Sequence, residues 1–168
     1  SVAAVTEQGL MTGVTGSTFA PDVTTTRGMM VTTLYRLAGE PQVEGTATFQ
    51  DVKSSAYYAN AVAWAEANGI AKGIDTGVFA PNAPVTREQA AAFAYRYVTA
   101  YLGKTPVPGA SLGGFQDAGL VSDYAAESLS WAHAAGLMVG YGDGFLGPKD
   151  TVTRAQMAKL LTLLAQNF

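Results

Sequence analysis

The segment Gly69-Ile70-Ala71-Lys72-Gly73, with Thr86-Arg87 placed so that the arginine follows the second glycine by 14 residues, decides how this chain is organised. The pattern is glycine, an aliphatic residue, two variable residues and glycine, then a Thr-Arg pair. It occurs three times: the other copies are residues 9–13 with Thr26-Arg27 and residues 136–140 with Thr153-Arg154. Agreement at several fixed positions indicates a tandem repeat, in which each copy forms one supersecondary unit.

Further shared residues set the extent of the copies. Copies two and three open with Phe49-Gln50-Asp51 and Phe115-Gln116-Asp117, and they carry Trp64 and Trp131 five residues before the first glycine. Copy one lacks this opening, and Ala4 stands at the tryptophan position. We therefore predict one domain over residues 1–168, with an N-terminally incomplete copy one at 1–41, copy two at 49–103 and copy three at 115–168.

Each copy is predicted to form two helices joined by a compact loop. In copy two the first helix is expected over about residues 57–68, ending at Gly69, because glycine just past a helix favours the left-handed cap. The second helix starts at the threonine. Thr86 and Thr153 are each followed three residues later by glutamine, which makes a capping box, whereas copy one has Met29 there and should have a weaker first turn.

The second helices each carry one apolar stripe. Apolar residues follow the arginines at offsets of three, seven and ten: Met30, Leu34 and Leu37; Ala90, Ala94 and Tyr97; Met157, Leu161 and Leu164. Three equivalent stripes bury best against each other. The sequence thus predicts an all-α fold with a central three-helix bundle of approximate threefold pseudo-symmetry and the first helices packed outside it.

The composition of the chain excludes several classes of function. Charged residues make up 14% of the chain and the net charge is −3, so the basic field needed for nucleic-acid binding is missing. Zero cysteines and one histidine exclude thiolate and histidine-rich metal sites, and we recognise no catalytic motif. We predict no enzyme activity, cofactor, metal, nucleic-acid partner or membrane insertion. The start lacks signal-peptide features, so an export signal has been removed or the chain is part of a longer surface protein.

The arginines and tryptophans each have two interpretations. Each arginine could pair with Asp51 or Asp117, or cover the core with its stem. Alternatively, arginine, free backbone amides and helix dipole could bind a carboxylate or phosphate. Each tryptophan could belong to the core or stack on a saccharide. For the two aspartates, capping of the first helix is expected.

Together, the Phe-x-Asp opening, the tryptophan, the glycine pair, the Phe-x-Pro turn and the Thr-Arg-x-Gln start resemble S-layer homology (SLH) repeats. The resemblance implies a three-pronged spindle and non-covalent attachment, outside the cell, to secondary cell-wall polysaccharide carrying pyruvate ketals. A peptidoglycan-linked glycan is the alternative partner that the resemblance implies. The resemblance makes the arginine the ligand of the ketal carboxylate, in grooves between neighbouring copies. The implied saccharide-binding residues are Arg27, Arg87, Arg154, Trp64, Trp131, Thr26, Thr86 and Thr153.

The copies depart from the family pattern, and these departures predict that one of the three grooves is impaired in saccharide binding. Copy one has Gly28-Met29 where the family prefers Ala-Glu, and copies two and three have glutamine for that glutamate. If each groove joins an arginine to the tryptophan of the next copy, Arg154 faces Ala4 and has no aromatic partner. An alternative function is a structural protein–protein interaction module of a surface-layer assembly, which a large exposed apolar patch would favour.

Overall fold

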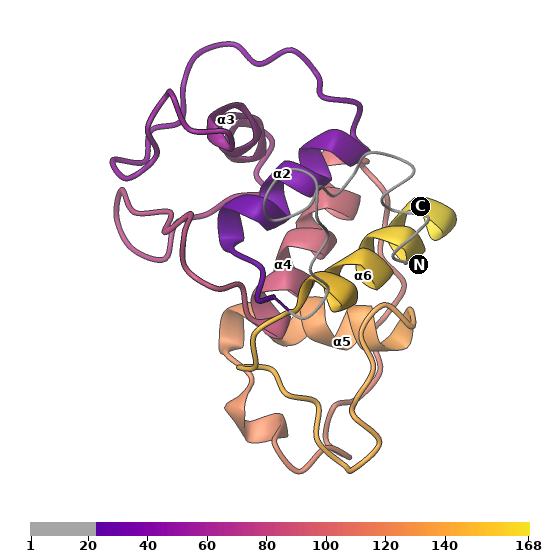
Figure 1. Cartoon of the computed structure of the whole chain (residues 1–168). Coiled ribbons are helices and arrows are strands. Elements are labelled where there is room, and N and C mark those ends of the chain that lie inside the picture. Colours follow the sequence, from indigo (N-terminus) through magenta and orange to yellow (C-terminus); the bar gives the residue numbers. More distant parts are fainter. Residues whose placement is uncertain (1–22) are drawn as a thin grey trace.

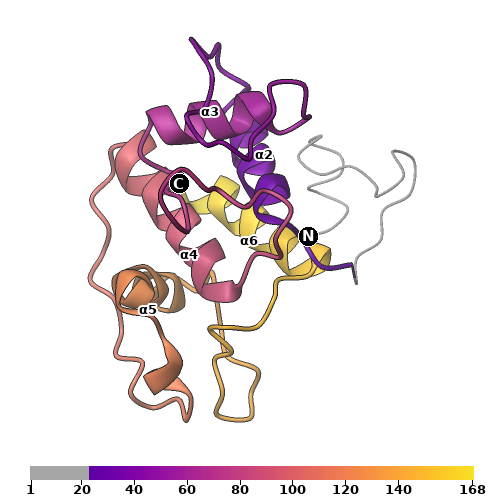
Figure 2. The same cartoon turned by 90° about the vertical axis from the view of Figure 1, so that its left-hand side faces the viewer.

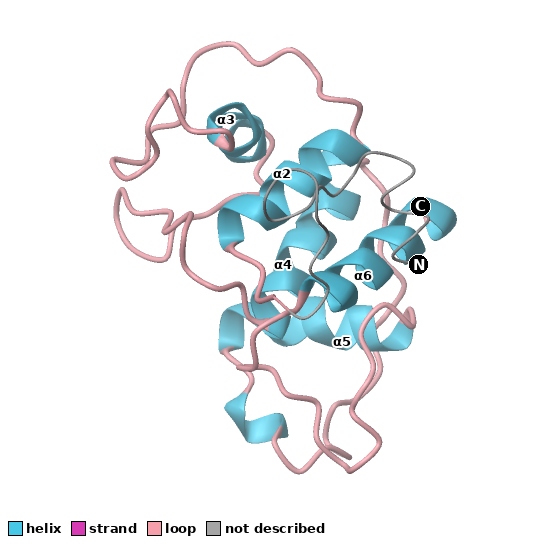
Figure 3. Cartoon of the chain, in the orientation of Figure 1, coloured by secondary structure: helices cyan, strands magenta, loops and turns pink. Residues whose placement is uncertain are grey.

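The computed structural model of the chain describes residues 23–168, and this part is helical, with five α-helices and no β-strand (Figure 3). The all-α prediction is therefore confirmed for the described part of the chain. The helices are α2 (Arg27–Leu37), α3 (Ala59–Ala67), α4 (Arg87–Arg96), α5 (Ala126–Ala134) and α6 (Arg154–Asn167). A π-helical turn at Tyr97–Tyr101 extends α4, and 3-10 turns lie at Ala118–Leu120 and Asp123–Ala125.

The first helices end as their glycines predict. Gly69 after α3 and Gly136 after α5 have φ values of 73° and 74°, in the left-handed region. In copy two the amide of Ile70 donates to the carbonyl of Ala65 at 2.7 Å, and the amide of Gly69 donates to that of Glu66 at 3.2 Å. These two bonds form a Schellman cap. Helix α3 begins at Ala59, two residues after the predicted start.

The second helices begin at the three threonines, with unequal caps. Thr86 and Thr153 each form a complete capping box with the glutamine three residues later. Thr26 accepts a hydrogen bond from the amide of Met29 at 3.1 Å, and methionine has no group that could bond back. The prediction of two full boxes and one partial cap is confirmed.

A closed ring of backbone hydrogen bonds links the starts of the three second helices. The amide of Thr25 donates to the carbonyl of Val152 (2.8 Å), Val152 donates to Val85 (2.9 Å), and Val85 donates to Thr25 (2.9 Å). Each of these residues lies two positions before its arginine. The three copies are therefore joined cyclically at this point, and each copy provides hydrogen-bond partners for backbone groups of the other two.

Helices α2, α4 and α6 occupy the middle of the molecule in both views, with α3 on one side and α5 on the other (Figures 1 and 2). Helix α3 of copy two packs against α2 of copy one, and α5 of copy three packs against α4 of copy two. Leu34, Ala94 and Leu161, which hold equivalent positions on the three stripes, expose no surface, whereas Leu37 at the end of the first stripe is only partly buried. The helix pairs α2–α3 and α4–α5 therefore join neighbouring copies, in addition to core contacts within a copy such as Phe79 with Phe93.

Candidate functional site: grooves between the copies

Arg27 reaches from the start of α2 into copy two. Its Nε donates to the carbonyl of Phe79 at 2.8 Å, and its Nη2 donates to the carbonyl of Lys72 at 3.3 Å. The guanidinium also lies over the rings of Phe79 and Phe93, at 4.7 and 5.2 Å from their centroids. Burial lowers the pKa of Arg27, although arginine stays charged at any physiological pH. The arginine thus fastens copy one to copy two through backbone carbonyls.

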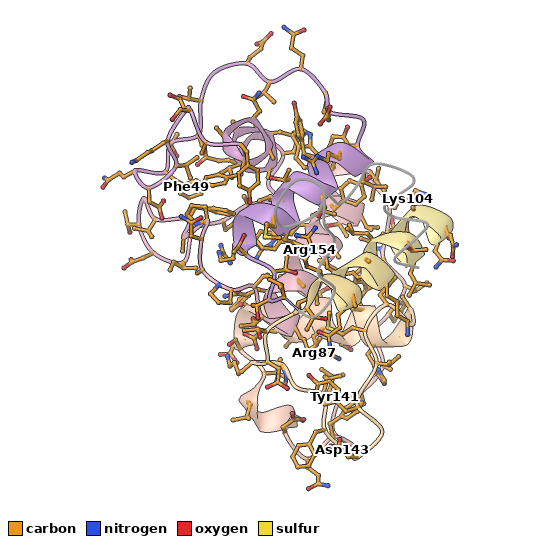
Figure 4. All side chains as sticks on the ribbon, in the orientation of Figure 1. Phe49, Arg87, Lys104, Tyr141, Asp143 and Arg154 are labelled. Carbon is orange, nitrogen blue, oxygen red and sulfur yellow. The ribbon has the colours of Figure 1, made fainter. Side chains whose placement is uncertain are left out.

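Arg87 makes the same contacts one copy further along. Its Nε donates to the carbonyl of Leu146 at 3.0 Å and its Nη2 to that of Val139 at 2.5 Å. The guanidinium lies 4.8 Å from the ring centroid of Tyr141, and the two side chains adjoin in Figure 4. Arg154 is buried at the start of α6, and its amide donates to the carbonyl of Val23 at 3.0 Å.

The equivalent side-chain contacts of Arg154 would involve Thr12 and Phe19, which lie outside the described residues, as does Ala4. The side-chain hydrogen bonds of Arg27 and Arg87 go to backbone carbonyls of the next copy. No ion pair within 4.0 Å joins Arg27 or Arg87 to Asp51 or Asp117 among residues 23–168.

The two aspartates have a different role from the predicted one. Asp51 accepts from the amides of Phe79 (2.9 Å) and Ala80 (2.7 Å), and Asp117 accepts from those of Leu146 (2.9 Å) and Gly147 (2.8 Å). They do not cap α3 or α5, which begin without a side-chain cap. Ala80 has φ 60°, so the carboxylate holds a strained turn in place. The helix-capping prediction is wrong, because both oxygens of each carboxylate accept from loop amides instead.

The first-turn amides of α2 and α4 are not available for an anion. In α4, the amide of Arg87 donates to the carbonyl of Asp150 (2.8 Å) and that of Glu88 to the carbonyl of Pro148 (3.0 Å). The third amide, of Gln89, donates to Thr86 Oγ1 at 3.3 Å. The first three amides of α2 are occupied in the same way, by two carbonyls of copy two and by Thr26 Oγ1. The idea that free amides help to bind a carboxylate is therefore wrong for these helices, and the threonine hydroxyls serve as caps.

Both tryptophans lie in the core. Trp64 is 3% exposed and Trp131 is 1% exposed. Trp64 packs against Tyr35, Tyr97 and Tyr101, with centroid distances of 5.5, 6.5 and 5.1 Å. Burial this complete leaves no indole face to stack on a saccharide, so the predicted stacking role of Trp64 and Trp131 is corrected to core packing. The proposed pairing of arginines with these tryptophans fails for the same reason.

A groove of about 510 Å³ opens beside Arg27, and we call it the Arg27 groove. Its lining includes Arg27, Lys72, Arg96, Glu88, Tyr124 and Lys149. Lys149 Nζ pairs with Glu88 Oε2 at 3.1 Å, so this acid and this base neutralise each other. Arg27, Lys72 and Arg96 remain as cations that line the same hollow. They come from two copies, and the groove exists only because the copies pack together.

An equivalent but smaller hollow of about 200 Å³, the Arg87 groove, lies between copies two and three. It is lined by Arg87, Tyr141 and Lys159 among others. Val139 here holds the position that Lys72 holds in the Arg27 groove, since each residue precedes the second glycine of its copy. The Arg87 groove is thus smaller and carries fewer cations.

Two groove residues were not anticipated from the sequence. Glu88 is buried, and Glu88 Oε1 accepts from the amide of Ser122 at 3.1 Å. Burial acts to raise the pKa of Glu88, but hydrogen bonds from Ser122 and the charge of Lys149 bring it below its usual value. Burial and the Glu88 carboxylate raise the pKa of Tyr124 to about 12. The sequence held one signal that Glu88 is special: copies one and three have Gly28 and Ala155 at the equivalent position.

Two further searches concern the described residues only. Within residues 23–168, no helix combines the length and apolar character needed to cross a bilayer. In the same range, no group of three or more histidine or acidic side chains is arranged to hold a metal ion.

Comparison with known proteins gives one family. The sequence profile described as the S-layer homology domain matches residues 1–29, 48–91 and 114–158. An endoglucanase of Bacillus sp. (strain KSM-635) is 34% identical over 94% of this chain and 16% of its own length. The surface-layer 125 kDa protein of Lysinibacillus sphaericus is 31% identical over 99% of this chain and 14% of its own length.

An amylopullulanase of Thermoanaerobacterium thermosulfurigenes is 32% identical over 90% of this chain and 8% of its own length. In each of these three relatives the chain spans less than a fifth of the whole protein.

Proposed function

Because the chain belongs to the S-layer homology family, whose proteins are anchored at the cell surface, we propose that it attaches a longer surface protein to the wall by binding pyruvylated secondary cell-wall polysaccharide. Attachment is non-covalent and the module is not a catalyst. The relatives support a shared attachment role, since proteins named as two different enzymes and as a surface-layer protein match this chain over a small part of their length.

The proposed architecture is a spindle with three pseudo-equivalent prongs around a bundle of α2, α4 and α6. The ring formed by Thr25, Val85 and Val152 supports it, because a cyclic set of hydrogen bonds between equivalent residues is what threefold pseudo-symmetry requires. The amides of Arg27, Arg87 and Arg154 form a second cyclic set, donating to Ala83, Asp150 and Val23. Each acceptor lies four residues before the arginine of its own copy.

The observation that carries the proposed ligand is the charge of the Arg27 groove. Arg27, Lys72 and Arg96 line it, while its one carboxylate is already paired with Lys149. Such a surplus favours an anion in a chain whose overall charge is −3. Two guanidinium N–H groups of Arg27 are occupied by carbonyls. Arg27 itself is only 4% exposed. The exposed Lys72 and the half-buried Arg96 are therefore the groove cations that a ketal carboxylate can reach.

The test is co-sedimentation of the chain with purified cell wall, before and after chemical removal of ketal pyruvate. Binding should be lost on removal, and it should be weakened by Lys72→Ala, which removes a groove cation without touching the core. Lys53→Ala, which removes another exposed cation that does not line the groove, is the matched control. Equal binding to walls with and without the ketal would contradict the proposed ligand.

A further inference from the structure

Three aromatic rings join copies one and two. The ring centroid of Trp64 in copy two lies 5.5 Å from that of Tyr35 in copy one and 5.1 Å from that of Tyr101 in its own copy. The two tyrosines lie eight and 14 residues after the arginines of their copies (35 − 27 = 8 and 101 − 87 = 14). The tryptophan is thus held between rings of both copies, and we call this set of three rings an aromatic lock.

The junction between copies two and three has the same lock. The ring centroid of Trp131 in copy three lies 5.5 Å from that of Tyr95 in copy two and 5.7 Å from that of Phe168 in its own copy. Tyr95 and Phe168 hold the same offsets (95 − 87 = 8 and 168 − 154 = 14). Aromatic pairs at such distances stabilise a contact by more than the burial of their area alone.

The residues that would form the lock between copies three and one are not aromatic. Thr162 stands at the offset of eight residues and Pro41 at the offset of 14 (162 − 154 = 8 and 41 − 27 = 14). Ala4, which lies outside the described residues, stands at the tryptophan position. The ring is thus replaced at all three positions of this junction and at none of the positions of the other two.

The residue after the arginine differs in the same direction. In copy one it is Gly28, whose backbone approaches Tyr58 of copy two so closely that an added Cβ would meet that ring at 3.1 Å. In copy two it is Glu88, which pairs with Lys149 of copy three at 3.1 Å. In copy three it is Ala155, whose methyl group carries no charge and prevents the close approach that glycine allows.

The chain itself also joins the copies unequally. Residues 42–48 connect copy one to copy two, and residues 104–114 connect copy two to copy three, whereas copies three and one are not consecutive. A short linker keeps two copies at a high effective concentration, so that they rejoin quickly after separating. Copies three and one have this advantage only through copy two.

We propose that the junction between copies three and one is the point at which the domain opens. Copies three and one separate there, while the two aromatic locks hold copy two to both of them. The opening breaks the bond from the Thr25 amide to the Val152 carbonyl and the bond from the Arg154 amide to the Val23 carbonyl. In repeat proteins each junction contributes its own stability, and native proteins open first where stability is lowest. This inference concerns the domain itself and goes beyond the proposed attachment to a wall polymer.

The test is native-state hydrogen exchange of the ¹⁵N-labelled chain, followed by NMR. Each reporter amide crosses one junction: Thr25 and Arg154 that of copies three and one, Val85 and Arg27 that of copies one and two, and Val152 and Arg87 that of copies two and three. After correction for intrinsic rates, the first pair should exchange at least about 10-fold faster than the other four, as one missing aromatic pair predicts.

Two variants exchange the residues of the locks. Tyr95→Thr, which places the residue of copy three in copy two, should speed exchange at Arg87 and Val152 by about 10-fold and leave Arg27 unchanged. Tyr95→Phe is the matched control, since it keeps the ring and loses only the hydrogen bond to Glu127 at 2.9 Å. The double variant Ala4→Trp with Thr162→Tyr should slow exchange at Thr25 and Arg154 alone.

Equal protection of all six reporter amides would overturn the inference, because the ring would then open as a whole. Fast exchange at Thr25 without fast exchange at Arg154 would also overturn it, since that result indicates fraying of the chain near Thr25. If the double variant does not fold, Tyr95→Thr decides: equal acceleration at all three junctions, or none at Arg87 and Val152, would show that the rings do not set where the domain opens.

Discussion

The replacement of Arg87 by methionine should destabilise the fold as well as binding. Methionine keeps most of the aliphatic stem but removes the hydrogen bonds to the carbonyls of Leu146 and Val139. A hydrogen bond to a charged group contributes about 1.5–3 kcal/mol, so the loss of two costs about 3 kcal/mol or more. Domains of this kind are stable by roughly 5–15 kcal/mol, so the change is a large fraction of the total.

Urea unfolding followed by tryptophan fluorescence is the assay, because Trp64 and Trp131 are buried and become exposed on unfolding. For Arg87→Met, the urea concentration at the unfolding midpoint should fall, with little change in the slope of the free energy of unfolding against urea. Arg87→Lys should lose less, since an ammonium can reach one carbonyl but cannot reproduce the fork. Arg96→Met is the control: Arg96 donates a hydrogen bond to the carbonyl of Ile70 at 3.3 Å, and its loss should cost less. A loss below about 1 kcal/mol for Arg87→Met would refute the fastening role of the arginine.

Three further stability predictions follow from the caps, the core and the aspartates. Thr86→Ala and Thr153→Ala should each cost about 0.5–2 kcal/mol and Thr26→Ala less, because Met29 cannot reciprocate; equal losses in urea unfolding would show that the glutamines contribute little. Leu161→Ala should cost about 2–5 kcal/mol by the same assay, since Leu161 exposes no surface; a loss below about 1 kcal/mol would mean that the site is not a packed core position. Burial acts to raise the pKa of Asp51, but the amides of Phe79 and Ala80 bring it below 3.8, and the amide of Leu146 does the same for Asp117. The contribution of these two carboxylates to the free energy of unfolding is therefore complete above pH 3.8 and is lost as the pH falls through the lower folded-state pKa. Asp51→Asn should thus flatten the acid side of the curve of stability against pH. An unchanged acid side would argue against a stabilising role of the Asp51 carboxylate.

The starts and ends of the helices were predictable, because residues within one turn of each helix end determine them. The starts of α4 and α6 follow from a threonine and a glutamine three residues apart, and the ends of α3 and α5 follow from a glycine in the left-handed region. The buried stripe positions were predictable from helical periodicity, since one face of each second helix is apolar.

Contacts between copies were not predictable in the same way. The sequence places Arg27 at a helix start but does not say that its partners are carbonyls 45 and 52 residues away. Asp51 was expected at the nearest helix, yet it holds a loop 28 residues further on. The place of Tyr124 in the Arg27 groove was not predictable, because its neighbours there, Arg27 and Arg96, belong to other copies.

The most direct test of the central claim, that an anionic wall sugar binds in the Arg27 groove, uses the methyl group of the pyruvate ketal as a probe. Intermolecular NOEs from that methyl group should reach side-chain protons of Phe93, Ile74 and Tyr124, which line the groove. NOEs confined to other surfaces, such as the hollow lined by Thr46, Ser54 and Asn60, would contradict the claim.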